Sequence, residues 1–194
     1  MSPQTIFWRR LDHEGHDCCR LKRHANGWCL EGVALFLHEA RPTCLRYVVQ
    51  CDDQWCTREA TVLGWVGEDE LSLSIIHTDA DGWLLNDVAQ SLPDGLVDLD
   101  LGFTPATNTI ALRRLALGVG EGRRAPAAYL AFPELRLDLL EQDYRRLAQH
   151  RYAYSAPRFS YEAVLMVTDE GFVTSYPGLW EACAGLKVRP LRGR

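Results

Sequence analysis

Residues 98–115 read DLDLGFTPATNTIALRRL and combine a strand-like start with a helix-like end. The opening alternation of Asp and Leu predicts a strand that places Asp98 and Asp100 on one face and the two leucines on the other. The Cα atoms of the two aspartates would lie about 6.5–7 Å apart, because a strand rises roughly 3.3 Å per residue. An ordinary strand does not need two such close carboxylates, so this face is a candidate surface for a polar ligand.

The second half of this stretch predicts the helix of the fold. Asn108 is a favourable N-cap residue, and Gly118 suits the C-terminal end of a helix over residues 108–117. Residues 134–150 compete for the same role because they contain strong helix formers, but their leucines alternate as in a strand. The better caps favour residues 108–117 as the helix.

Most of the remaining chain predicts short β-strands. Apolar and polar residues alternate over short runs bounded by Gly, Asp and Glu, and residues 169–171 form a good hairpin turn. The runs expected to be strands are 45–50, 61–66, 71–76, 127–132, 151–154, 161–167 and 172–175. The pattern indicates a mostly β protein, which we expect to form a single domain over residues 1–194 with a flexible basic tail at 187–194.

Composition argues against several classes of function. The formal net charge is −5, with 47% hydrophobic and 24% charged residues. This acidic, ordinary globular composition argues against nucleic-acid binding, which depends on basic residues that neutralise phosphates. No stretch approaches the ~18 consecutive apolar residues of a membrane-spanning helix, and residues 1–12 contain no apolar run of signal-peptide length. We therefore expect a cytoplasmic protein that does not span a membrane.

The 7 cysteines do not predict a disulfide framework, because their number is odd and nothing in the sequence indicates secretion. The histidines and cysteines between residues 13 and 24 could in principle bind a metal, but no second cluster accompanies them at the spacing of a zinc site. We predict no metal site and no cofactor.

The acid pair allows more than one interpretation. Two carboxylates this close raise at least one pKa unless a cation or a hydrogen-bond donor compensates, and Arg113 and Arg114 are candidates. Asp98 and Asp100 could accept hydrogen bonds from sugar hydroxyls, form an internal Asp–Arg pair, or face solvent. Their spacing also suits an inverting glycosidase, whose carboxyl groups lie roughly 6.5–9.5 Å apart. The sequence contains no serine-nucleophile motif and no Gly-rich phosphate loop before a helix.

Several segments carry a resemblance to a known family. Residues 98–115 resemble a signature that reads roughly D-x-D-L and then T-P-F-T-N-T-L-P-I-R-R-L, with Ala106 and Ala111 in place of the usual Phe and Pro. Residues 52–58 resemble its D-x-x-W-x-T-R stretch, and residues 142–144 resemble its Q-x-Y. The family is a group of bacterial proteins named for glycolipid binding and formerly classed as a domain of unknown function.

The resemblance implies a large antiparallel sheet curved around a single α-helix, remotely similar to bacterial lipoprotein-localisation factors. It also implies a homodimer and an acidic pocket for a glycolipid. Together with the reasoning from the residues above, it gives a set of expected ligand-binding residues: Asp53, Trp55, Arg58, Asp98, Asp100, Asn108, Arg113, Arg114 and Tyr144.

The leading interpretation is a non-enzymatic protein that binds an amphiphile with a sugar headgroup and has a role in glycolipid metabolism. A hydrolase that acts on a glycolipid or glycoside through the Asp pair is one alternative. A β domain that docks a partner without a small ligand is another. The three interpretations assign different tasks to Asp98 and Asp100: binding hydroxyls, catalysis, or internal neutralisation by arginine.

Overall fold

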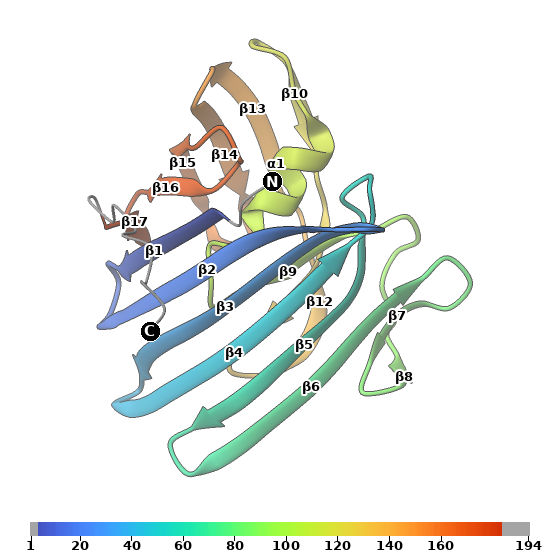
Figure 1. Cartoon of the computed structure of the whole chain (residues 1–194), viewed down its shortest axis with the longest axis vertical. Helices are drawn as coiled ribbons and strands as arrows, with labels where there is room; N and C mark the ends of the chain where they lie inside the picture. The colour runs from blue at the N-terminus through green and yellow to red at the C-terminus, as the bar shows by residue number, and fades with distance from the viewer. Residues whose placement is uncertain (1–3, 184–194) are drawn as a thin grey trace, which may run out of the picture.

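The computed structural model describes residues 4–183, and most of them lie in one long antiparallel sheet (Figure 1). This 14-stranded sheet curls without closing, because its end strands β10 and β8 do not pair with each other. Its strands, in spatial order, are β10 (Gly122–Arg124), β13 (Asp143–Ala148), β14 (Arg151–Ala156), β15 (Tyr161–Val167), β16 (Val173–Tyr176), β17 (Trp180–Ala182), β1 (Gln4–Arg10), β2 (Gly15–His24), β3 (Gly27–His38), β4 (Arg41–Cys51), β5 (Thr57–Val66), β6 (Asp69–Thr78), β7 (Gly82–Leu85) and β8 (Val88–Ala89).

A second sheet and a helix pack against the inner face of the long sheet. The second sheet has 3 strands in the order β12 (Arg136–Leu140), β11 (Ala127–Ala131) and β9 (Asp98–Leu101). The helix α1 (Asn108–Leu115) lies between the arm of long strands β2 to β6 and the arm formed by β13 to β15 (Figure 1). A short 3₁₀ turn, η1 (Pro157–Phe159), connects β14 to β15. These elements bring residues from both arms into one hydrophobic core.

The alternation along β9 is confirmed, because Leu99 and Leu101 are buried in the core. The other face of β9 carries the two aspartates, and Asp98 is itself buried at 2% exposure. Burying a charged group is costly unless it is paired, so this residue needs a cation beside it. The cation comes from the helix that follows in sequence.

The prediction of a mostly β fold around a helix is confirmed for the described residues. Residues 134–150 form strands rather than a helix, as their alternation indicated, and residues 169–171 form the turn between β15 and β16. The predicted tail at 187–194 lies outside the described residues. No helix in residues 4–183 has both the length and the apolar character needed to cross a bilayer.

The predicted helix caps are wrong. Thr107 is the N-cap residue and makes no capping hydrogen bond through its side chain. The helix ends at Leu115, and its C-cap residue is Ala116, whose φ is 44°. Asn108 is the first helical residue, and its side chain donates to Tyr144 instead of capping the backbone. A tertiary partner therefore replaced the local capping interaction that the sequence favours.

Candidate functional site

Helix α1 is held at both ends by buried polar contacts. At its start, Asn108 Nδ2 donates to the hydroxyl of Tyr144 at 2.8 Å. Near its end, Arg114 donates to both carboxylate oxygens of Asp98, at 2.6 and 2.7 Å. Such a bidentate pair fixes direction as well as distance. The position of Arg113, which lies between these anchors, is therefore set by the fold.

Asp98 has no free oxygen for a ligand. Its side chain is 3% exposed, and Arg114 occupies both oxygens. Burial raises the pKa of the Asp98 carboxyl, and the Arg114 guanidinium opposes that shift. The same pair raises the pKa of Arg114, which keeps the guanidinium charged. Asp98 could act on a sugar as a base or nucleophile only after this ion pair had opened.

Asp100 belongs to a hydrogen-bonded chain that runs to the start of α1. Gln142 Nε2 donates to Asp100 Oδ2 at 3.1 Å, and the Tyr144 hydroxyl donates to Gln142 Oε1 at 2.9 Å. Tyr144 in turn accepts the hydrogen bond from Asn108. Burial, together with the nearby charge of Asp98, raises the pKa of Asp100 to about 7. This chain therefore ends at a carboxyl group whose pKa lies well above that of an exposed aspartate.

A tight turn between β4 and β5 positions Trp55. Asp52 Oδ1 accepts hydrogen bonds from the backbone N–H groups of Gln54, at 2.8 Å, and Cys56, at 3.0 Å. Trp55 takes a left-handed backbone conformation, with φ at 66°, and its side chain is buried. Asp52, the acidic residue of the Asp-x-x-Trp pattern, therefore stabilises the turn, and the turn directs the indole of Trp55 into the interior.

The indole of Trp55 is part of a stack of aromatic and cationic groups. Its ring lies 4.8 Å from that of Trp28, centroid to centroid, and the two planes are 19° apart. The Arg23 guanidinium lies 4.8 Å from the Trp28 ring centroid, and that of Arg113 lies 5.5 Å from the Trp55 ring centroid. Stacked indoles between two cations form a rigid wall with a flat face and hydrogen-bond donors at its edges.

This wall borders a cavity of about 210 Å³. The residues that line the cavity come from strands β1 to β3, from α1 and from the β15–β16 turn: Gln4, Leu21, Arg23, Trp28, Arg113, Asp169 and Glu170. Gln4 Oε1 is buried and accepts no hydrogen bond from any described residue. The cavity is therefore lined by an indole, two guanidinium groups and two carboxylates that a single small ligand could contact.

A glycine lets the turn at the cavity approach α1 closely. A Cβ atom on Gly171 would lie 3.1 Å from Cδ of Arg113 and 3.5 Å from Cγ2 of Thr109, and its φ of 93° also disfavours other residues. The Thr109 hydroxyl donates to the Gly171 carbonyl at 3.2 Å, and Arg113 Nη1 donates to the Asp169 carbonyl at 3.3 Å. These contacts hold the turn against the helix.

The predicted ligand-binding residues do not surround one pocket. Trp55 and Arg113 meet at the cavity, and Asp53 reaches it through an ion pair with Arg23. Arg58 lies outside the same turn, where it pairs with Asp52 at 2.9 Å and with Asp79 at 3.1 Å. The remaining predicted residues form the two anchors of α1 and the chain that ends at Asp100.

Sequence reasoning missed several residues of the site, above all Trp28 and Gln142. Trp28 is far from Trp55 in sequence, and the two approach because Trp28 pairs with Cys51, just before the turn that carries Trp55. Only the strand register could have revealed this contact. Gln142 stands in the Gln-x-Tyr motif beside Tyr144, so the motif offered a signal for it.

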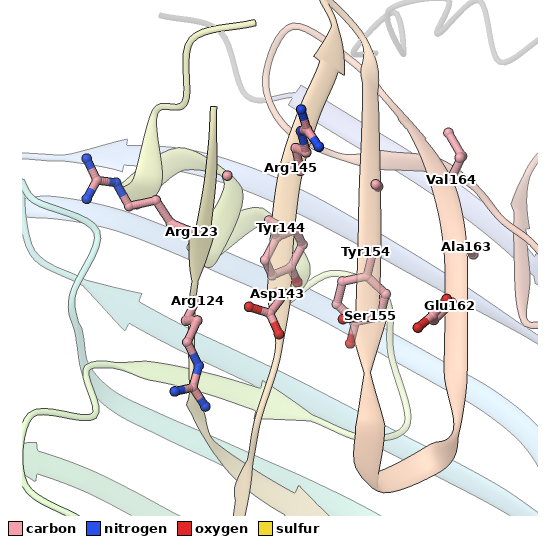
Figure 2. A pocket seen from close by; sticks show the side chains of 12 residues that line it. Arg123, Arg124, Asp143, Tyr144, Arg145, Tyr154, Ser155, Glu162, Ala163 and Val164 are labelled. Atoms are coloured by element: carbon pink, nitrogen blue, oxygen red, sulfur yellow. The ribbon is translucent and has the colours of Figure 1, made fainter. Parts of the chain in front are cut away.

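A larger groove, of about 620 Å³, lies on the strands β10, β13, β14 and β15 (Figure 2). Cross-strand neighbours Arg124, Asp143, Ser155 and Glu162 form one row along it. Of the predicted ligand-binding residues it includes Tyr144 alone, whose hydroxyl is turned to Asn108 and Gln142 in the interior. Arg113 lines the smaller cavity, and Trp55 and Asp53 contact its lining residues Trp28 and Arg23, so we take that cavity as the candidate site.

The fold is a curled sheet, and a compact cavity with polar lining lies beside its helix. Residues 5–182 match the family model described as "Putative glycolipid-binding", and the chain belongs to that family. It is also similar to the crystal structure of a DUF1089 family protein from Pseudomonas aeruginosa, with a TM-score of 0.74 and 27% identity over 93% of this chain and 92% of the other. No curated protein sequence matches the chain.

Proposed function

We propose that the protein binds an amphiphile with a sugar headgroup, and that the headgroup occupies the cavity beside Trp28. Membership in a family named for glycolipid binding supports the ligand class. The observation that carries the choice of site is the convergence of an indole, two guanidinium groups and three oxygen-bearing side chains on about 210 Å³. A ligand site typically combines apolar lining with a few well-placed polar groups.

Each wall of the cavity suits one part of a sugar ring. The ring has an apolar C–H face, which packs against the flat indole of Trp28. Its hydroxyls can accept hydrogen bonds from Arg23 and Arg113 and donate to Asp169 or Glu170.

The buried acid pair then serves the site indirectly. Asp98 holds Arg114, and the chain from Asp100 to Asn108 holds the other end of α1. Both contacts fix the helix that carries Arg113 into the cavity. A pre-organised site loses less entropy on binding than a mobile one. In this account the acids are positioning residues.

The hydrolase alternative is less well supported by the geometry. An inverting mechanism needs one carboxyl group as acid and a second carboxylate free to activate water. Asp100, with its raised pKa, could supply the first. Both oxygens of Asp98 are already taken by Arg114, so the second is not free. Binding without hydrolysis therefore remains the function we propose.

The test compares two amphiphiles with the same alkyl chain. Isothermal titration with octyl glucoside and with an octyl tetraethylene glycol ether, both below micelle concentration, separates sugar recognition from apolar contact. We expect the wild-type protein to bind the glucoside at least 10-fold more tightly than the ether. Trp28→Ala and Arg113→Gln should remove that preference, because each deletes one wall of the cavity.

Trp65→Ala is the matched control. It also removes an indole, but Trp65 is 38% exposed and borders a separate groove with Leu35 and Pro42. This variant should keep the preference for the glucoside. Equal binding of the two amphiphiles to the wild-type protein, or an equal effect of the two tryptophan variants, would contradict the proposal.

A further inference from the structure

A second cavity, of about 270 Å³, adjoins the first, and Arg113 and Asp169 line both. It lies among the end of α1, the β13–β14 hairpin and the β15–β16 turn. Arg146 and Tyr152 come from the two strands of the hairpin, and Thr168 comes from the turn.

Two guanidinium groups in this cavity have no carboxylate partner. Among residues 4–183, no Asp or Glu oxygen lies within ion-pair distance of Arg113 or Arg146. Asp169 is the one acid that lines the cavity, and its carboxylate pairs with His150 at 2.8 Å. The cavity therefore holds two guanidinium charges against one carboxylate, so its net charge is positive.

The guanidinium group of Arg146 is fixed in position by hydrogen bonds to backbone carbonyls. Its three nitrogens donate to the carbonyls of Leu117 at 2.7 Å, Gln149 at 3.0 Å and Ala148 at 3.3 Å. A guanidinium has five N–H groups, so two remain for a guest. Its Cζ also lies 5.7 Å from the ring centroid of Tyr152. Burial raises the pKa of Tyr152, and the charges of Arg146 and Arg113 lower it, as expected if both guanidinium groups face its hydroxyl.

We propose that this second cavity binds a phosphate group, and that the phosphate belongs to the same ligand whose sugar occupies the first cavity. The proposal rests on the function proposed above. Arginine recognises phosphate through paired N–H donors, and the hydroxyls of Tyr152 and Thr168 can add donors. Because Arg113 borders both cavities, a phosphate attached to the sugar could contact it from the second cavity.

The test is isothermal titration of the full chain with glucose, glucose 1-phosphate and inorganic phosphate at low ionic strength. We expect glucose 1-phosphate to bind at least 10-fold more tightly than either glucose or phosphate. Arg146→Gln should reduce the affinity for both phosphate-containing probes at least 10-fold and leave that for glucose unchanged. Arg113→Gln should weaken all three.

Arg145→Gln is the matched control, because Arg145 is the exposed neighbour of Arg146 on β13 and lines neither cavity. It makes the same charge change and should change no affinity. If Arg146→Gln does not fold, Tyr152→Phe replaces it, with a loss of several-fold for the phosphate-containing probes and none for glucose.

Three outcomes would overturn the inference in distinguishable ways. Glucose binding as tightly as glucose 1-phosphate would refute the phosphate site and leave the proposed function standing. Inorganic phosphate binding as tightly as glucose 1-phosphate would assign the cavity to the free ion and refute the link to a sugar. Phosphate affinity that Arg145→Gln reduces as much as Arg146→Gln would show general charge attraction instead of a site.

Discussion

Asp17 offers a quantitative test of the interior electrostatics. Its side chain lies in β2 with 0% exposure, Oδ1 accepts a hydrogen bond from the Tyr47 hydroxyl at 2.9 Å, and Oδ2 has no partner among the described residues. The Thr104 hydroxyl completes the group by donating to Tyr47 at 3.2 Å. Burial raises the pKa of Asp17 from 3.8 to about 7, and the two hydroxyls only partly oppose it.

The pH dependence follows from this raised pKa. Below pH ~4 the carboxyl is protonated in both the folded and the unfolded chain, so it costs nothing. As the pH rises, the unfolded chain ionises first, and the folded state loses stability until the pH passes about 7. One pKa unit corresponds to about 1.4 kcal/mol, so the full loss is about 4 kcal/mol, of which about 3 kcal/mol falls between pH 5 and pH 8.

Asp17→Asn removes this loss. Urea unfolding of the variant and of the wild type at several pH values gives the difference in unfolding free energy, in which all other titrating groups cancel. That difference should move in favour of the variant by about 3 kcal/mol between pH 5 and pH 8. Asp69→Asn, at a side chain that is 84% exposed, should show no such trend. A pH-independent difference for Asp17→Asn would refute the reasoning.

Other variants test the anchors and the packing around α1. Arg114→Gln leaves Asp98 buried without a cation and should lower the free energy of urea unfolding by about 3–5 kcal/mol at pH 8. The loss should be smaller at pH 5, where the carboxyl can take a proton. An equal loss at both pH values would contradict this. Tyr144→Phe leaves the side-chain amides of Asn108 and Gln142 without their hydrogen-bond partner and should lower the free energy of unfolding by about 1–3 kcal/mol. An unchanged denaturation midpoint would count against the hydrogen-bonded chain. Ala106→Phe puts the residue expected from the family at a position with 0% exposure and should destabilise by about 1–3 kcal/mol, whereas a neutral or stabilising effect would show that the core can repack.

The elements that sequence predicted well are those with a strong local pattern. The alternation along β9 and the choice of α1 over residues 134–150 both depend on residue order within a few positions. The caps of α1 were mispredicted because Asn108 has a stronger partner in Tyr144, which is distant in sequence. The small sheet was not predicted, since the parallel pairing of β9 with β11 leaves no local signature.

The site was harder to predict for the same reason. The sequence identified Trp55 and Arg113 as candidates, but their meeting at one cavity depends on how the β4–β5 turn faces α1. For Asp98 and Asp100 the sequence left open sugar binding, a solvated face or an internal Asp–Arg pair. The structure has the internal pair for Asp98, with Arg114, whereas Asp100 ends a hydrogen-bonded chain. The sequence shows which charged side chains are present, and the fold determines which of them can contact a ligand.

The central claim is that the cavity beside Trp28 holds a sugar headgroup. Native mass spectrometry of gently purified wild-type protein, followed by extraction and identification of what is bound, tests it most directly. We predict a sugar-containing amphiphile at near-stoichiometric amount that is lost from Trp28→Ala and retained by Trp65→Ala. A bound lipid without a sugar, or a glycolipid that Trp28→Ala retains in full, would contradict the claim.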